Sequence, residues 1–448
     1  MASILLLIKK EIPSQIAPGK TVAIGPLIWK HLPSSLYPYL QKLCSEGLIE
    51  IEALDLLDDQ DLIWFYIVLD ACRSQGLVYE KLIDKKQILA SYIPLATRKG
   101  ITKQEFSEEE EFELSRFAFL SLQKGIWQLH CPLSSAEMQI HDERCFALLQ
   151  FLSQKAKVKE LYGKTTLSQA AVDLFLSYLL GMDIIGKQEC AALQQWEFHD
   201  LMFHVNSRKG RHNKPIGGTY RFKENIPPLP VLKPPMTHER ISLYKPSLEE
   251  IKRSDEPFTN ILEKRASIRE YTNVITDKQL GEFLYRSARV KAVCKNDLQD
   301  LSKRVYPGGG AIYELELYPV IRTCQGMDSG MYHYDPQDHV LEKIENSLLE
   351  IDPFIQNAVW ATGGKCMPQV VILIAARFQR LSWKYQTIAY ATILKNTGVL
   401  IQTMYLVATA MKLAPCGIGS GDSEHFSKVT GLDYYTETTV GEFILGSP

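Results

Sequence analysis

Residues 306–321 have the sequence YPGGGAIYELELYPVI. Gly308, Gly309 and Gly310 follow Pro307 and, having no side chains, let the backbone approach a flat ligand closely. The residues after them are typical of a strand. A second run, VVILIAARF at 370–378, has the length and continuous hydrophobicity of a strand covered on both faces. Helical segments alternate with these strands, so we predict an α+β fold with a central mixed sheet flanked by helices.

Composition limits the classes of function. The chain has 448 residues, 46% apolar and 23% charged, with a formal net charge of -2. This length allows roughly two to four domains, and the charge gives no general affinity for nucleic acid. The apolar N-terminal run is too short for a secretion signal, and polar residues interrupt the apolar segment 388–413. We therefore expect a cytoplasmic protein with neither a nucleic-acid nor a membrane partner.

Cysteine and histidine spacing gives no metal signature. The nine cysteines are odd in number and form no C-x-x-C pair, which indicates neither a disulfide framework nor a zinc site. His199, His204 and His212 do not match a common ligand spacing. We expect no metal.

The proline-rich segment 226–247 marks the clearest boundary, because prolines prevent a helix or a central strand. We interpret it as a linker before a domain at 248–448. On its N-terminal side, segments 1–95 and 110–225 each run from short strands through helices to a glycine-led strand. That order is typical of a winged-helix unit and predicts a degenerate repeat. The expected helices are too apolar for reading DNA, which favours peptide docking or dimer scaffolding.

In KRASIREY, at 264–271, Arg265, Ser267 and Arg269 are spaced two apart. In an extended segment these side chains point to one side, and two guanidinium groups with a hydroxyl suit a phosphate. A solvated surface strand would have the same pattern. Other motifs have to decide between the two interpretations.

These motifs together resemble the flavin-dependent nitroreductase superfamily. RASIREYT resembles its opening signature, and YPGGGAIYELELYPVI resembles its second flavin-contacting turn. The turn followed by GMYHYDPQDHVL, at 330–341, is similar to the azoline oxidase branch of ribosomal peptide heterocycle biosynthesis, which includes the cyanobactin oxidases. The segment 196–222 is similar to the same branch. The resemblance implies a nitroreductase-like FMN domain that is a homodimer, with the flavin between subunits.

Lys384 and Tyr385 stand side by side before a long apolar segment that we expect to be helical from about residue 382 to residue 413. The oxidases of this branch carry an adjacent Lys-Tyr pair at the same place, so the resemblance implies a catalytic role. Aromatising an azoline removes a hydride and a proton, and the proton needs a base. A lysine can act as that base only where its surroundings favour the neutral amine. The alternative is a helix end with a packed tyrosine and an exposed lysine.

The resemblance also implies flavin contacts at Gln402, Gly417 and Gly419, in the long helix and the loop after it. Two departures from the family pattern change the expected flavin contacts. Gly308 and Ala311 stand where relatives often carry Ser and Asn, so a side-chain bond to the ring is missing at that turn. The chain also lacks the basic residues near its end that many relatives use on the phosphate. Arg265 and Arg269 should therefore make a larger share of the contacts with the phosphate than they do in relatives.

Four functions follow from these observations. The first is an FMN-dependent oxidase of thiazolines and oxazolines in a heterocyclised peptide, with O2 as electron acceptor. The second is an NAD(P)H-dependent nitro- or quinone-reductase on the same fold. A flavin-free binding protein and a DNA-binding regulator are the other two.

Overall fold

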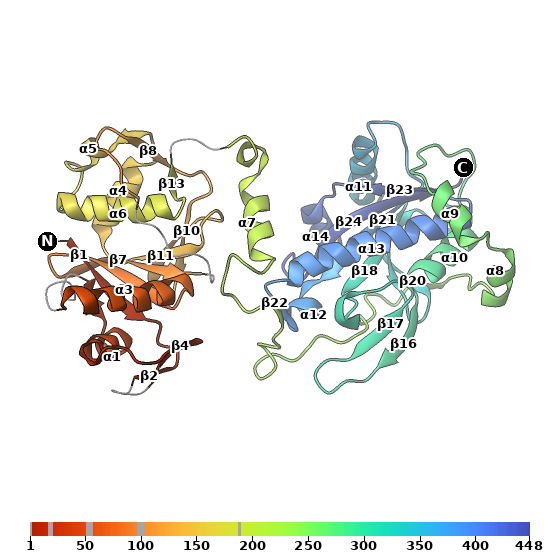
Figure 1. Cartoon of the computed structure of the whole chain (residues 1–448). Coiled ribbons are helices and arrows are strands. Elements are labelled where there is room, and N and C mark those ends of the chain that lie inside the picture. Colours follow the sequence, from red (N-terminus) through yellow and green to blue (C-terminus); the bar gives the residue numbers. More distant parts are fainter. Residues whose placement is uncertain (1, 17–20, 51–56, 96–103, 187–189) are drawn as a thin grey trace. The chain divides into compact units, whose positions relative to one another are not determined.

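The structure is a computed structural model of the 448-residue chain. It describes residues 2–16, 21–50, 57–95, 104–186 and 190–448. The chain forms two compact units, Met1–Lys214 and Pro215–Pro448, whose elements are labelled in Figure 1.

The first unit contains a seven-stranded antiparallel sheet with the order β5-β1-β6-β7-β11-β10-β9. Its strands are β1 (Ala2–Ile8), β5 (Leu48–Ile49), β6 (Val78–Asp84), β7 (Gln87–Pro94), β9 (Phe119–Gln123), β10 (Ile126–His130) and β11 (Ala136–Ile140). Small sheets stand beside it, formed by β2 (Ser14–Ile16), β3 (Val22–Ile24) and β4 (Leu27–Trp29), and by β8 (Glu111–Leu114), β12 (Ala156–Lys157) and β13 (Ile185–Gly186).

The helices of this unit are α1 (Tyr37–Ser45), α3 (Asp59–Ser74), α4 (Glu143–Phe151), α5 (Val158–Leu161), α6 (Gln169–Gly181) and α7 (Phe198–Asn206), with short 3-10 turns at Ser34–Leu36 and Leu193–Gln195. Helices α1, α3, α4 and α6 pack on strands of the large sheet. Tyr178 of α6 donates a hydrogen bond to Glu80 of β6. Arg73 of α3 pairs with the same carboxylate at 2.8 Å.

This unit joins the two segments that we had interpreted as separate winged-helix-like units. Strand β7 of the first segment pairs with β11 of the second, from Ala90 opposite Ile140 to Pro94 opposite Ala136. The pairing satisfies two strand edges that would otherwise expose unpaired N–H and C=O groups. A single hydrophobic core extends through both segments.

The second unit is built on another seven-stranded sheet, with the order β15-β20-β19-β18-β21-β24-β23. We expected a mixed sheet, but every ladder of this sheet is antiparallel, because hairpins join β18, β19 and β20 and helical connections reverse the chain elsewhere. The strands are β15 (Arg240–Ser242), β18 (Leu315–Ile321), β19 (Gly330–Asp335), β20 (Val340–Glu345), β21 (Val370–Arg377), β23 (Ala414–Ile418) and β24 (Glu437–Gly446). Two further pairs are β14 (Gly217–Gly218) with β22 (Tyr385–Gln386), and β16 (Val290–Cys294) with β17 (Leu301–Arg304).

Helices cover both faces of this sheet (Figure 1). One face packs against α10 and α13, and the other against α11 and α14. The helices are α8 (Leu248–Ser254), α9 (Phe258–Lys264), α10 (Asp277–Ala288), α11 (Leu348–Ala361), α12 (Phe378–Ser382), α13 (Ala389–Ala410) and α14 (Ser423–Thr430), with a 3-10 turn, η3, at Gly309–Ala311. None of the helices in the described part of the chain is long and apolar enough to cross a bilayer.

The proline-rich segment 226–247 is part of the second unit and not a free linker. Its β15 is the edge strand of the sheet, paired with β20. Lys233 forms an ion pair with the buried carboxylate of Glu437, and the Met236 N–H donates to Glu342 at 3.0 Å. The Pro230 carbonyl accepts from Arg377 at 3.0 Å. Polar contacts to the sheet, which the proline pattern does not reveal, fix this segment.

Candidate functional site

The glycine turn is held against the N-terminal half of α13. The Gly309 N–H donates to Asn396 Oδ1 at 3.0 Å, and Asn396 Nδ2 donates to Glu314 Oε1 at 2.9 Å. Asn396 and Glu314 are buried, and burial raises the pKa of the Glu314 carboxyl. Gly310 has a φ of 64°, a conformation that favours glycine. These buried hydrogen bonds, from Gly309 to Asn396 and from Asn396 to Glu314, therefore fix the backbone of the turn.

Lys384 and Tyr385 lie in the short link between α12 and α13, and not in the long helix itself. A Cβ placed on Gly310 would collide with the Tyr385 hydroxyl and would lie 2.9 Å from Lys384 Nζ. The predicted catalytic pair and the predicted ring-contacting turn thus meet at Gly310. Only a residue without a side chain leaves both polar groups against the backbone there.

Buried hydrogen bonds support this link. Arg380, which is fully buried, donates to the carbonyls of Leu229 (2.8 Å), Asp300 (2.9 Å) and Ile312 (2.7 Å). Burial, together with the nearby cations of other arginines, lowers the pKa of Arg380 to about 10. Trp383 Nε1 donates to a carbonyl at the start of the proline-rich segment, at 2.6 Å. These contacts restrict the chain on the N-terminal side of Lys384.

A second cluster forms near the C-terminal half of α13. Ser267 Oγ and the Tyr405 hydroxyl are 2.8 Å apart, and the Gly417 N–H donates to the same hydroxyl at 2.7 Å. The Arg265 guanidinium lies over the Tyr405 ring, 5.4 Å from its centroid. Arg265, Ser267 and Arg269 are exposed on a non-helical segment. Two exposed guanidinium groups and a hydroxyl can receive a phosphate.

The two clusters contact different parts of α13. Asn396 and Tyr405 are nine residues apart, which corresponds to about 13 Å along a helix axis. Gln402, which lies between them in sequence, and Gly419 are exposed. The predicted residues thus form two groups: the turn from Pro307 to Gly310 with Lys384 and Tyr385, and Arg265 and Ser267 with Gly417.

The exposed face of α13 is unusually apolar. Tyr390, Leu394 and Val399 are exposed, and the position of a Cβ on Gly398 has no atom within 4 Å. Two exposed side chains of the neighbouring α9, Phe258 and Leu262, add to this surface. We call these residues the α13 surface.

Glu442 of β24 lies beside the loop that follows β23. A Cβ on Gly421 would collide with its carboxyl group, so the loop covers this side chain. Glu442 is 6% exposed. Burial raises the pKa of Glu442 from 4.5 to about 7, although a hydrogen bond with Thr439 acts in the opposite direction.

Stability should therefore depend on the Glu442 proton. Between pH 4.5 and 7 the folded protein holds this proton and the unfolded chain does not, so stability falls as the pH rises through that range. Because the pKa rises from 4.5 to about 7 on folding, the loss over this range is about 3 kcal/mol. We expect Glu442→Gln to unfold at higher urea concentration than the wild type at pH 8, with little difference at pH 4.5. An equal pH slope in both proteins, with the exposed Glu424→Gln as control, would contradict this.

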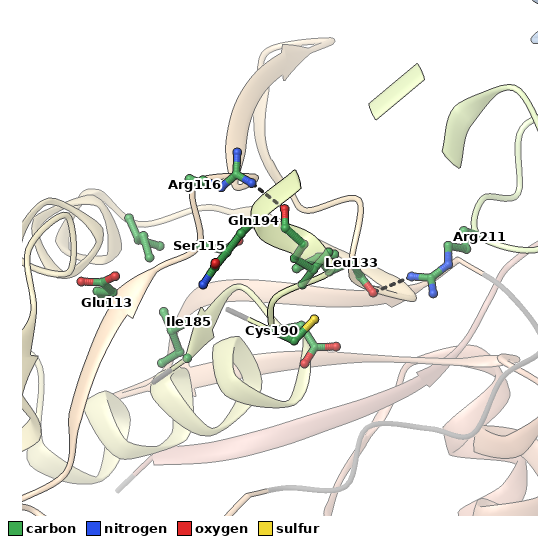
Figure 2. A pocket seen from close by; sticks show the side chains of 12 residues that line it. Glu113, Ser115, Arg116, Leu133, Ile185, Cys190, Gln194 and Arg211 are labelled. Atoms are coloured by element: carbon green, nitrogen blue, oxygen red, sulfur yellow. Dashed lines mark hydrogen bonds between the residues drawn. The ribbon is translucent and has the colours of Figure 1, made fainter. Parts of the chain in front are cut away.

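A surface cavity of about 840 Å³ lies in the first unit (Figure 2). The end of β8, β13 and the segments around Cys190 and Arg211 form its wall. Arg116 donates to the Leu193 carbonyl at 2.6 Å, and Arg211 donates to the Leu133 carbonyl at 2.8 Å. Both guanidinium groups thus bind carbonyls of the cavity wall. The predicted site residues are not among the described residues that line this cavity.

Comparisons with known proteins give family matches for two regions of the chain. Residues 262–447 match the model of the nitroreductase family, and residues 112–213 match the model of the cyanobactin oxidase ThcOx. A candidate nitroreductase from Methanocaldococcus jannaschii is 26% identical over 198 residues, which cover 44% of this chain and 93% of that protein. Residues 262–447 have the nitroreductase fold.

Two solved structures are similar at lower identity. A structure from Ralstonia eutropha JMP134, described as a nitroreductase, is 18% identical, covers 52% of this chain and 98% of its own, and has a TM-score of 0.37. A chain of the E. coli microcin synthetase McbBCD complex, solved with truncated pro-MccB17 bound, is 17% identical, covers 59% of this chain and 99% of its own, and has a TM-score of 0.35.

The family matches confirm the resemblance inferred from the glycine turn and the R-x-S-x-R segment. The ThcOx match also reaches back to residue 112, whereas the motifs had indicated this branch only from about residue 190. Both matched families are oxidoreductases by name.

Sequence reasoning missed two supporting residues of the second unit. Asn396 holds the glycine turn, and Tyr405 links Ser267 to Gly417. The signal for Asn396 was present, because a buried amide within an apolar helix needs a hydrogen-bond partner. The position of Tyr405 gave no comparable signal.

Proposed function

We propose that the chain is an FMN-dependent azoline oxidase, which converts thiazolines or oxazolines in a heterocyclised ribosomal peptide into thiazoles or oxazoles. The matches to the nitroreductase family and to ThcOx support an oxidase of this class. The observation that carries the proposal is the meeting of Lys384 Nζ and the Tyr385 hydroxyl at the backbone of Gly310.

The residues present fit a flavin nucleotide. The exposed Arg265, Ser267 and Arg269 would hold the phosphate, and the turn from Pro307 to Gly310 leaves bare backbone for a flat ring. Gln402, Gly417 and Gly419 would complete the contacts. A bound FMN would supply the hydride acceptor for the azoline ring, with O2 as the final electron acceptor.

The chain itself handles the proton. The Lys384 amine takes the proton from the ring carbon next to the one that loses the hydride, which leaves the aromatic azole. Tyr385 orients Lys384, since both groups lie against the same glycine. The buried hydrogen bonds of Arg380 and Trp383 hold the backbone before Lys384 at a fixed place, which limits where its amine can lie.

We propose further that the protein is a homodimer in which each flavin contacts both chains. We call Arg265 and Ser267 with Gly417 the phosphate cluster, and the turn from Pro307 to Gly310 with Lys384 and Tyr385 the catalytic cluster. The two clusters contact parts of α13 that are about 13 Å apart along the helix. The α13 surface exposes Leu394 and Val399 on the same helix. A second copy that covers this surface would bring its catalytic cluster to the phosphate cluster of the first.

Mixed dimers test this arrangement. Arg265→Ala removes the phosphate cluster of one chain, and Lys384→Ala removes the catalytic amine of the other. In a mixed dimer one site is then intact and the other is doubly damaged. At an FMN concentration too low to fill the Arg265→Ala site, random mixing of the two variants should therefore restore about a quarter of wild-type activity. Restoration is expected only after subunit exchange. No restoration in verified mixed dimers would contradict a shared site.

The phosphate assignment predicts a selective loss of affinity. Arg265→Ala should weaken FMN binding about tenfold or more, because a charge-assisted hydrogen bond is lost. Riboflavin lacks the phosphate, so its affinity should not change. Fluorescence titration of the flavin-free protein measures both, with Arg253→Ala in α8 as the control variant. Equal loss for both flavins would contradict the assignment.

For the first unit we propose a role in docking the peptide substrate. Peptide-clamp modules add a peptide as an extra strand at a sheet edge. In this chain β11 is paired on both sides, with β7 and with β10, so it cannot accept another strand. Strand addition in this sheet would have to use an outer strand, β5 or β9.

A nitro- or quinone-reductase is the second candidate, favoured by the M. jannaschii relative. Anaerobic mixing of the yellow protein with a thiazoline peptide, and separately with NADPH, distinguishes the two functions. We expect the peptide to bleach the flavin and to lose two hydrogens per ring in mass spectrometry. Bleaching by NADPH alone would favour the reductase and contradict the oxidase.

A further inference from the structure

The segment 215–222, PIGGTYRF, lies along the link that carries the catalytic pair. Gly217 pairs with Gln386, and Gly218 pairs with Tyr385, in the short ladder of β14 and β22. The Tyr220 N–H donates to the Lys384 carbonyl at 3.2 Å. Further hydrogen bonds tie Thr219 to the Gln386 side chain and the Thr387 hydroxyl to the first carbonyl of the segment. The backbone on both sides of Lys384 is thus fixed by a segment more than 160 residues earlier in the chain.

The Lys384 side chain runs along this segment. A Cβ on Gly218 would be in ordinary contact with Lys384 Cε, at 3.8 Å, and with the Tyr220 ring, at 3.7 Å. Lys384 Nζ is 5.8 Å from the centroid of the Tyr220 ring and 5.2 Å from that of Tyr385. The nitrogen therefore lies near two phenol rings, with Gly310 beside it.

Tyr220 is itself held in place. Its ring packs edge-on against Trp383, with centroids 5.7 Å apart and planes at 80°. Trp383 is buried, and its indole N–H is bonded to the Ile226 carbonyl. Tyr220 has a φ of 51°, so its backbone adopts a conformation that is uncommon for a residue with a side chain. A ring held by a buried indole can restrict a flexible lysine.

We propose that Tyr220 is a positioning residue, whose ring holds the Lys384 amine against the glycine turn. A lysine side chain has many rotamers, and most of them would take the amine away from Gly310. The Tyr220 ring, whose centroid is 5.8 Å from Lys384 Nζ, excludes part of this space. The catalytic meaning of this contact rests on the proposed function, but the contact itself does not.

Substitution of the ring tests the proposal. Tyr220→Leu should lower kcat for azoline oxidation about tenfold or more, with KM and flavin content little changed, because the amine is less often in place. Tyr220→Phe keeps the ring and should retain most of the activity. Tyr244→Leu is the matched control, since the Tyr244 ring also lies under a lysine ammonium, that of Lys278 at 4.7 Å, away from the proposed machinery.

Chemical labelling gives a readout that needs no turnover. The purified full-length protein is given a short pulse of N-hydroxysuccinimidyl acetate, and acetylation of Lys384 is followed by mass spectrometry with Lys278 as the internal reference. We expect Lys384 to react several-fold faster in Tyr220→Leu than in the wild type or in Tyr220→Phe, because the ring no longer covers the amine.

The two readouts separate the possible failures. Unchanged labelling in Tyr220→Leu overturns the proposal, and so does changed labelling with wild-type turnover. A wild-type protein that oxidises no azoline contradicts the proposed function. Faster labelling of Lys384 in Tyr220→Leu would then still support its positioning by Tyr220.

Discussion

Replacing Lys384 with alanine should abolish aromatisation of an azoline peptide while the protein keeps its flavin. The amine lies beside Gly310, where the predicted ring-contacting turn and the catalytic pair meet. General-base catalysis contributes about 10²- to 10⁴-fold to a rate, and we expect a loss of kcat in that range. Mass spectrometry of the peptide gives the rate, and the visible spectrum gives the flavin content.

Two further variants sharpen this test. Lys384→Arg keeps a positive charge but cannot give up its proton in a protein, so it should be as inactive as the alanine variant if the amine is a base. Lys278→Ala removes an exposed lysine that also lies over a tyrosine ring, and it should behave as the wild type. Normal turnover by either Lys384 variant would remove the assignment of Lys384 as the base.

The Gly310→Ala variant should be the second most damaging change. The new methyl group would collide with the Tyr385 hydroxyl and come within 2.9 Å of Lys384 Nζ. Both obstructing groups end flexible side chains, so we expect the protein to fold with the catalytic pair displaced. Because a displacement of about 1 Å can reduce catalysis about 100-fold, kcat should fall by roughly that factor.

Gly364→Ala is the control for backbone strain. Gly364 has a φ of 73°, close to the 64° of Gly310, but a Cβ on it would meet no atom within 4 Å. Both variants should lose a similar part of their thermal stability, and only Gly310→Ala should lose activity. Equal activities in the two variants would show that the contact with the catalytic pair does not matter.

The sequence predicted those helices and strands that depend on patterns of neighbouring residues. Thr276 caps α10 with a capping box to Gln279, a pattern set by residues three apart in the sequence. The apolar run from residue 370 is β21, buried at every position. The expected long helix, however, begins at Ala389 and not near residue 382. Tyr385 and Gln386 are held extended because they pair with Gly218 and Gly217. No local pattern predicts a pairing between residues so far apart in the sequence.

The sequence predicted which residues belong to the site, but it did not predict which of them lie together. The resemblance identified the glycine turn, the R-x-S-x-R segment and the Lys-Tyr pair. It did not reveal that Ser267 and Gly309 contact different parts of α13, because that depends on the packing of the whole unit. The buried relay from Asn396 to Glu314 and the contact of Tyr220 with Lys384 are likewise products of tertiary structure.

The docked proline-rich segment has a practical consequence for dissecting the protein. A fragment cut after residue 247, where the composition suggests a natural boundary, would lose the carbonyl partners of Arg377, Arg380 and Trp383. It would also leave the Glu437 carboxylate without its lysine. Such a fragment would leave buried charged groups without partners near Lys384 and Tyr385, and it would be prone to aggregate. A fragment that begins at Pro215 would retain all of these contacts.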